Sequence, residues 1–215
     1  MDHESAPCPL CESTAGLACR AHGRSFFHCP LCDLCFVPSE QHPSLEQAAA
    51  RYARHRNTLD HVEYVARLTR LIELLRMHAP DARRVLDFGC GADSVMTSLL
   101  SAAGYDAHGH DPIHDIHADL SQPFDAIIAS ETLEHVASPR DEFARIHRLL
   151  MPSGLLIATT RFHSGPASFA DWWYIRDVTH VCFFSTMTFD FIAAMFGFTL
   201  LMHDNHEAVV LRKRD

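Results

Sequence analysis

The stretch Val85-Leu86-Asp87-Phe88-Gly89-Cys90-Gly91-Ala92-Asp93 decides the fold of this chain. The apolar run at 84–88 predicts a short strand, and it leads directly into a Gly-x-Gly bend. A helix is predicted to follow from about residue 94 to 103. Glycines at such a bend permit a sharp turn and let the backbone approach a ligand closely. The stretch therefore predicts a strand, a ligand-binding turn and a helix in succession.

Strands and helices alternate on both sides of this turn. Further strands are predicted at 106–110, 124–130 and 155–160, with helices at about 60–78, 139–150 and 186–196 and a closing antiparallel pair at 198–202 and 208–212. This alternation predicts an α/β fold, a doubly wound, Rossmann-like, mostly parallel sheet with a C-terminal antiparallel strand. We expect this domain to span 81–215. Residues 39–80 would form a connector with amphipathic helices, and Ser44 would cap a helix beginning near Leu45.

An acidic residue follows the next predicted strand. Asp111 lies twenty positions after Gly91. In nucleoside-binding α/β folds, an acid at this spacing accepts hydrogen bonds from the ribose hydroxyls. The alternative is that Asp111 is simply a turn residue before Pro112.

Four motifs together resemble the class I S-adenosylmethionine (SAM)-dependent methyltransferases. They are VLDFGCGADS (85–94), GHDP (109–112), FDAIIASETLEHVASP (124–139) and LLMPSGLLIATT (149–160), and the resemblance covers roughly residues 84–212. It implies that SAM is the cofactor and that the chain is a methyltransferase. It further implies cofactor-binding roles for a set of residues at the bend and after the following strands: Asp87, Gly89, Cys90 and Gly91 at the amino-acid end, Asp111 at the ribose, Asp119 on the adenine side and Glu131 in the pocket wall.

Two features depart from the family pattern. Asp93 stands where family members commonly have a further glycine, so its carboxylate would either face the methionine end of the cofactor or cap the helix starting near Ser94. The segment between Asp111 and Phe124 is short, which predicts an abbreviated third strand.

The acceptor pocket is expected from two segments, 131–135 and 171–185. The second contains W-Y-x-x-D-x-T-H-V-x-F-F-S, a pattern that resembles a bacterial subgroup of uncharacterised methyltransferases with N-terminal cysteines. Aromatic faces suit the positive charge of a sulfonium. His135 and His180 are the candidate catalytic bases, because imidazole titrates near neutrality. The alternative is that both histidines are structural, and many enzymes of this class need no base.

Six of the eight cysteines precede residue 36. Cys8, Cys11, Cys29 and Cys32 form C-x2-C, a gap of seventeen residues, and C-x2-C, which predicts a tetrahedral Zn²⁺ site in a zinc ribbon at 1–38. Cys35 competes with Cys32 as a ligand, but it fits the position of a packing residue better. A redox role is the alternative, yet no strand and helix of a thioredoxin-like unit flank these pairs. In a fragment this small, metal binding should supply much of the folding energy.

Charge and composition limit the partners. A net charge of -9 with a single lysine, Lys213, disfavours a nucleic-acid partner, since phosphates are neutralised by clustered Lys and Arg. No segment approaches the ~20 apolar residues of a membrane span, and the acidic start does not resemble a signal peptide. We therefore expect a cytoplasmic enzyme acting on a small-molecule acceptor. A tRNA or RNA methyltransferase and a non-catalytic binding or scaffold protein are the alternatives.

Overall fold

The computed structural model describes residues 4–53 and 58–215. Its larger sheet has six strands in the order β10-β11-β8-β7-β5-β6. The strands are β5 (Arg84–Phe88), β6 (Asp106–His110), β7 (Phe124–Ser130), β8 (Leu150–Thr159), β10 (Phe198–His203) and β11 (Ala208–Lys213). Strands β5 to β8 pair in parallel, whereas β11 is antiparallel to both β8 and β10. The mostly parallel α/β sheet predicted from the sequence is confirmed.

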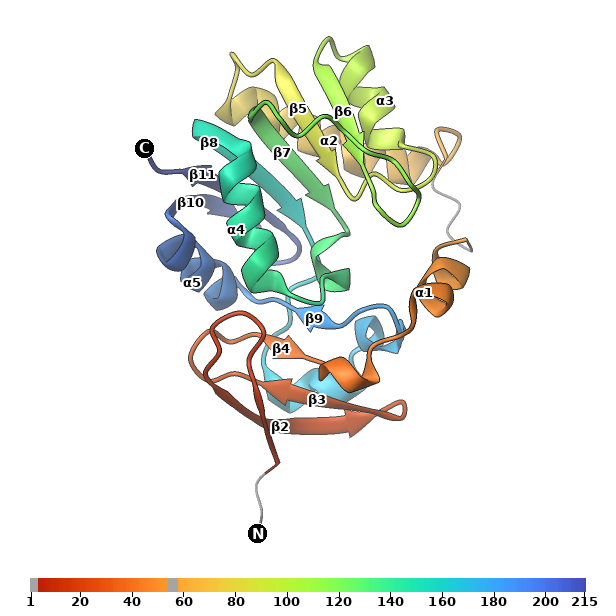
Figure 1. Cartoon of the computed structure of the whole chain (residues 1–215), viewed down its shortest axis with the longest axis vertical. Helices are drawn as coiled ribbons and strands as arrows, with labels where there is room; N and C mark the ends of the chain where they lie inside the picture. The colour runs from red at the N-terminus through yellow and green to blue at the C-terminus, as the bar shows by residue number, and fades with distance from the viewer. Residues whose placement is uncertain (1–3, 54–57) are drawn as a thin grey trace.

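Helices cover both faces of this sheet. They are α2 (Val62–His78), α3 (Val95–Ala102), α4 (Pro139–Leu149) and α5 (Thr186–Phe196), whereas α1 (Leu45–Tyr52) lies apart from the sheet (Figure 1). One apolar core joins α2 and α3 to one face of the strands, and a second joins α4 and α5 to the other. Ser44 caps α1 as expected, in a reciprocal capping box with Gln47. Within the described residues, no helix is both long and apolar enough to cross a membrane.

The N-terminal residues form a second, smaller sheet. Its strands are β1 (Ser5–Pro7), β2 (Thr14–Ala21), β3 (Arg24–His28), β4 (Cys35–Phe36) and β9 (Cys182–Phe183), in that spatial order and antiparallel throughout. Strand β9 comes from the C-terminal half of the chain, so the small sheet is completed by the large domain. In Figure 1, β9 (blue) lies between β4 and the large sheet. One continuous apolar core includes Phe26 of the small sheet and Phe183 of β9.

Three sequence expectations differ from the structure. Residues 111–116 form a turn closed by one isolated bridge between Asp111 and Ile116, and 117–123 are irregular, so the abbreviated third strand is absent. Strand β8 begins at Leu150 and not at 155 as predicted, and residues 152–154 form a bulge within it. Ser94, and not Asp93, occupies the N-cap of α3, and neither side chain caps the helix.

Short 3-10 helices carry much of the remaining chain. They are η1 (Ser39–Gln41), η2 (Leu133–His135), η3 (Pro166–Asp171) and η4 (Trp173–Arg176). Helix η2 follows β7 at the carboxyl end of the parallel strands, and η4 lies in the segment before β9. In open α/β sheets, ligands bind at the carboxyl ends of the strands. This topology brings the two segments expected to form the acceptor pocket to the edge of the sheet that holds the glycine bend.

Candidate active site and metal centre

The glycine bend is shaped by backbone conformations that favour glycine. Gly89 and Gly91 have φ angles of 76° and 66°. A Cβ atom at Gly89 would lie 2.4 Å from a side-chain atom of Thr132, whereas a Cβ at Gly91 would meet nothing within 4 Å. The first glycine therefore permits close packing against the segment after β7. The second leaves open space beside the backbone, where a ligand can approach.

The carboxylate of Asp111 closes the bend from the neighbouring strand. Its Oδ2 accepts a hydrogen bond from the Gly91 amide at 3.0 Å, and its Oδ1 accepts from the amides of Ile113 and His114 at 3.0 and 3.2 Å. The residue is 8% exposed. The bend and the acidic residue that sequence spacing paired are therefore in direct contact, with carboxylate lone pairs left to accept further hydrogen bonds.

Asp87 organises the helix after the bend. Its Oδ2 accepts hydrogen bonds from the backbone N–H and the hydroxyl of Thr97, at 2.9 and 2.7 Å. Thr97 is the third residue of α3, so Asp87 satisfies a helical N–H that no N-cap side chain reaches. Burial raises the pKa of Asp87 to about 6, against the effect of these hydrogen bonds. Asp93 is thus released from capping and lines the cavity beside the bend.

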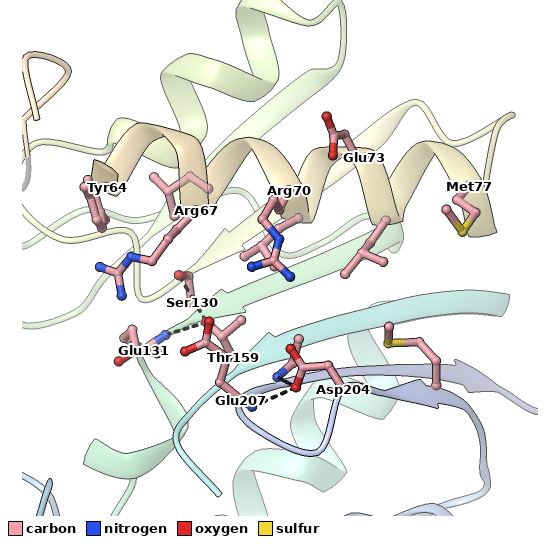
Figure 2. Close-up of a pocket in the computed structure, with 15 residues that line it drawn as sticks. Tyr64, Arg67, Arg70, Glu73, Met77, Ser130, Glu131, Thr159, Asp204 and Glu207 are labelled. Carbon is pink, nitrogen blue, oxygen red and sulfur yellow. Dashed lines mark hydrogen bonds between the residues drawn. The ribbon is translucent and has the colours of Figure 1, made fainter. Parts of the chain in front are cut away.

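A cavity of about 790 Å³ extends from the bend to the segments after β7 and before β9. Gly89, Cys90, Gly91, Asp111 and Glu131 all contribute to its lining. A smaller cavity of about 150 Å³ adjoins it between α2 and the β10–β11 hairpin. Figure 2 shows Arg67 and Arg70 extending from α2 toward this smaller space, with Glu131 at its edge. The larger cavity is the candidate site because it contains the bend.

Two acids follow β7 at the cavity wall. Glu131 adopts a left-handed backbone with φ 50°, and its amide donates to the Thr159 carbonyl at 2.9 Å. Such conformations are uncommon outside glycine and cluster at functional sites. Glu134 is fully buried, and its Oε1 accepts a hydrogen bond from the Tyr174 hydroxyl at 2.6 Å. Burial raises the pKa of both carboxyl groups to about 7, and their mutual repulsion adds to the effect at Glu131.

His135 and His180 lie side by side in the same cavity, with ring centroids 4.9 Å apart. Nδ1 of His135 is 3.0 Å from the Thr179 carbonyl, and Nδ1 of His180 is 2.9 Å from the Tyr174 carbonyl. Because a carbonyl oxygen only accepts, each Nδ1 carries the proton and each Nε2 keeps a free lone pair. Burial lowers the pKa of both rings, that of His180 to about 3, so both are neutral near pH 7.

Asp119 and Asp87 differ from the other residues that the sequence predicted to bind the cofactor. The Asp119 side chain accepts from the Ser121 amide, and its backbone carbonyl accepts from Arg84. Among the described residues that line the larger cavity, neither Asp119 nor Asp87 is present. The adenine-side role of Asp119 therefore stays a prediction.

Two residues that line this cavity, Glu134 and Tyr174, and one that holds a lining segment, Arg24, had no role predicted from the sequence. Glu134 and Tyr174 were part of the expected acceptor segments, but each sits in a 3-10 helix without a periodic pattern to single it out. Arg24 of β3 lies outside those segments altogether. Its guanidinium donates to the carbonyls of four residues in the segment before β9, namely Ile175, Asp177, Val178 and His180.

The cysteine cluster forms where the spacing predicts it. One sulfur atom from each of Cys8, Cys11, Cys29 and Cys32 lies within 4.8 Å of the others. The Cys8–Cys32 and Cys11–Cys29 sulfur pairs are 3.5 and 3.4 Å apart, too far for a disulfide bond of about 2.05 Å. Four sulfurs at about 2.3 Å from one zinc ion lie roughly 3.8 Å apart. The arrangement fits tetrahedral zinc, and Cys35 is outside the cluster.

The two Cys-Pro-Leu-Cys segments fold alike. The residue after each segment, Glu12 or Asp33, has a left-handed backbone with φ 63° or 58°. Its amide donates to the carbonyl of the first cysteine, Cys8 or Cys29, at 2.9 Å in both cases. Burial raises the pKa of Cys11, while the Cys32 thiol donates to Cys8 and lowers the pKa of Cys8 to about 5. The repeated sequence thus produces two matching knuckles that face each other.

Comparison with known proteins places the large domain in a family. A family model described as "Methyltransferase domain" matches residues 52–203. The Ubiquinone biosynthesis O-methyltransferase of Roseobacter denitrificans is 30% identical over 101 residues, which cover 36% of this chain and 40% of that protein. The corresponding protein of Ruegeria pomeroyi is 30% identical over 111 residues, covering 40% of this chain and 44% of its own length. The chain thus spans less than half the length of these curated relatives.

Solved structures share the fold at low sequence identity. N-methyltransferase NodS from Bradyrhizobium japonicum WM9, in complex with S-adenosyl-L-homocysteine, superposes with a TM-score of 0.58 at 14% identity, covering 80% of this chain and 100% of that one. The 1,6-didemethyltoxoflavin-N1-methyltransferase of Burkholderia thailandensis gives 0.57 at 16% identity, covering 87% and 99%.

Proposed function

Because this chain belongs to the methyltransferase-domain family, we propose that it transfers the methyl group of SAM to a small-molecule acceptor. One observation carries the proposal: Asp111 contacts the open glycine bend at the carboxyl ends of the parallel strands. The relatives named for ubiquinone biosynthesis and for 1,6-didemethyltoxoflavin act on small molecules, which supports an acceptor of that class.

The residues around the bend fit SAM as the cofactor. The space beside Gly91 admits a ligand against its backbone, and Asp111 retains acceptor capacity for ribose hydroxyls. Asp93 and Glu131 place acidic groups on the wall of the cavity, and the aromatic side chains of Tyr52 and Trp173 line it as well. Negative charge and aromatic faces both favour a positively charged sulfonium. In this assignment, Asp87 acts indirectly by fixing the start of α3.

Bound SAM supplies an electrophilic methyl group on sulfur. The main task of the protein is then to hold the acceptor in line with that group and to exclude water. His135 and His180 are placed to accept a proton from an acceptor hydroxyl or amine, since each offers a free Nε2 to the cavity. Glu134 holds Tyr174 against the same wall through its hydrogen bond.

We also infer that Cys8, Cys11, Cys29 and Cys32 bind one structural zinc ion. The sulfur cluster and the matching knuckles support this assignment. The second knuckle also contacts the large domain, because Oδ2 of Asp33 accepts from the Ser185 hydroxyl at 2.5 Å and the Asp33 carbonyl accepts from His163. The zinc would therefore stabilise an N-terminal sheet that packs against the acceptor segment.

The test of the proposed function is transfer of radiolabel from methyl-labelled SAM. The protein is incubated with a deproteinised small-molecule extract in one reaction and with total RNA in another, and calorimetry measures SAM binding in parallel. We expect saturable SAM binding and label only in the small-molecule fraction. Label in RNA would favour an RNA methyltransferase, and no saturable heat with SAM would favour a non-catalytic scaffold.

Metal analysis of the purified protein tests the zinc assignment. We expect one zinc per chain in the wild type, and loss of that zinc together with reduced stability in Cys8→Ser. Cys35→Ser is the matched control, because Cys35 is buried next to the cluster without belonging to it. Retention of zinc by Cys8→Ser would contradict the ligand set.

A further inference from the structure

The acceptor cavity contains a second group of side chains with the chemistry of metal ligands. One potential ligand atom from each of Glu134, His135 and His180 lies within 4.8 Å of the other two. All three residues line the cavity. Two of them are adjacent in η2 and the third lies in the segment before β9, so the group exists only where these two segments meet.

Both imidazoles are already oriented as metal ligands are. A metal-binding histidine usually donates one ring N–H to a carbonyl or carboxylate, which fixes the ring and directs the other nitrogen to the metal. His135 and His180 each make this contact through Nδ1, to the carbonyls of Thr179 and Tyr174. Asp177 is the nearest further acid, with its Oδ2 4.0 Å from Nε2 of His180. It is held beside the group by an ion pair with Arg51 at 2.6 Å and by a hydrogen bond from the Thr179 hydroxyl.

The carboxylate supplies an independent observation. Glu134 is 0% exposed, and its Oε1 accepts from Tyr174. Its Oε2 is buried with no hydrogen-bond partner among the described residues. An unpaired buried carboxylate oxygen is costly, and a cation is one of the few partners that satisfies it.

From these contacts we propose that Glu134, His135 and His180 bind a divalent transition-metal ion in the acceptor cavity. Two imidazole nitrogens and one carboxylate oxygen form the ligand set of catalytic zinc and of non-haem iron or manganese sites, which keep positions open for substrate. Neighbouring nitrogen and oxygen ligands at about 2.1 Å from one tetrahedral ion lie roughly 3.4 Å apart, so the three side chains must move closer together to complete the site.

This inference rests on the proposed function and narrows its substrate class to acceptors with an ionisable hydroxyl group. The acceptor oxygen binds an open position of the metal, which lowers its pKa, and its proton is released to water. The oxygen lone pair then forms the O–CH₃ bond as the S–CH₃ bond breaks, and the electron pair stays on sulfur. The sulfonium becomes a neutral thioether, and the acceptor becomes a methyl ether. His135 and His180 act as ligands in this scheme and not as bases.

The experiment uses the full chain loaded with one equivalent of zinc, which binds to the four thiolates of the cysteine cluster and leaves the second site open. Co²⁺ is added as the probe, and binding is followed by calorimetry and by visible absorption, where nitrogen and oxygen ligation is distinguished from thiolate ligation by the absence of sulfur charge-transfer bands. We expect one further equivalent of Co²⁺ to bind. Glu134→Gln and His180→Gln should each weaken this binding at least about tenfold.

His147→Gln is the matched control, since His147 is a half-buried histidine that packs on Phe198 outside the cavity. Its Co²⁺ affinity should stay within about twofold of the wild type. SAM calorimetry on every variant reports whether the large domain is folded. If the zinc-loaded wild type takes up no further Co²⁺ while SAM still binds, this inference is wrong and the methyltransferase proposal stands. If SAM does not bind, the proposed function itself fails.

Discussion

Arg24 offers the sharpest test of how the small sheet and the candidate active site are connected. It is 8% exposed, and it donates to carbonyls of the segment 175–180, among them Asp177 and His180, each at 2.9 Å. Replacing it with alanine leaves four buried or half-buried carbonyls short of a donor. A hydrogen bond to a charged group contributes about 1.5–3 kcal/mol, but the cost of burying the guanidinium offsets part of this sum. We expect Arg24→Ala to lower the free energy of unfolding by about 3–5 kcal/mol, as removal of one partner from a buried charged network does.

Urea unfolding followed by tryptophan fluorescence measures this change directly. Trp172 and Trp173 are the only tryptophans, and both precede the segment that Arg24 holds. Arg20→Ala is the matched control, because Arg20 makes an exposed ion pair with Glu4 on the same small sheet, and such pairs contribute about 1 kcal/mol or less. Arg24→Lys should give an intermediate loss, since one ammonium cannot reach all four carbonyls. If Arg24→Ala cost no more than Arg20→Ala, the proposed connection would be wrong.

Three further predictions concern the bend and the C-terminal hairpin. Asp111→Ala should weaken SAM binding by about 1.5–3 kcal/mol in calorimetry, with the exposed Asp190→Ala on α5 as control; unchanged affinity would remove Asp111 from the site. Gly89→Ala should destabilise the fold by about 2–4 kcal/mol in thermal unfolding, because its φ is 76° and its Cβ would meet Thr132 at 2.4 Å, and an equal loss in Gly91→Ala would refute the steric reason. Burial alone would raise the pKa of Asp204, but the backbone amides of 206–208 donate to it and lower the pKa overall. The charged Asp204 carboxylate therefore stabilises the fold above the unfolded pKa of about 3.9, and this stabilisation is lost as pH falls through the lower folded pKa. Asp204→Ala should lower the free energy of unfolding by roughly 1 kcal/mol at pH 7, and by less below about pH 4. A pH-independent difference would contradict the charge assignment.

Local pattern was sufficient for the parts of the site that the chain builds from neighbouring residues. The apolar run before Gly89 and the acid after the next strand predicted a bend and a carboxylate in contact, and Asp111 does bond to the Gly91 amide. Parallel strands end at the same edge of a sheet, so residues that follow successive strands meet there without further information. The spacing of the cysteines was also sufficient, because each Cys-x2-Cys pair forms a knuckle from neighbouring residues.

Of the two alternatives for Asp93, the helix cap is not formed, because another carboxylate occupies that position. The carboxylate of Asp87, ten positions before Thr97, accepts a hydrogen bond from the backbone N–H of Thr97 at the start of α3. A sequence pattern can indicate a capping residue only among the neighbours of the helix start. Which carboxylate accepts from the helical N–H depends on the position of the preceding strand, which places Asp87 there. Asp93 then remains on the cavity wall.

The sequence by itself determined the α/β fold, the glycine bend with its acid, and the four-cysteine cluster, because each depends on residues a short distance apart in the chain. Only the tertiary structure decided that β9 completes the N-terminal sheet, that Arg24 holds a segment more than 150 residues away, and that Glu134 meets His180. Those contacts join residues far apart in the chain, where the cost of closing the loop is met by burial and hydrogen bonding of the whole assembly. Local periodicity and spacing in the sequence do not indicate whether burial and hydrogen bonding offset that cost.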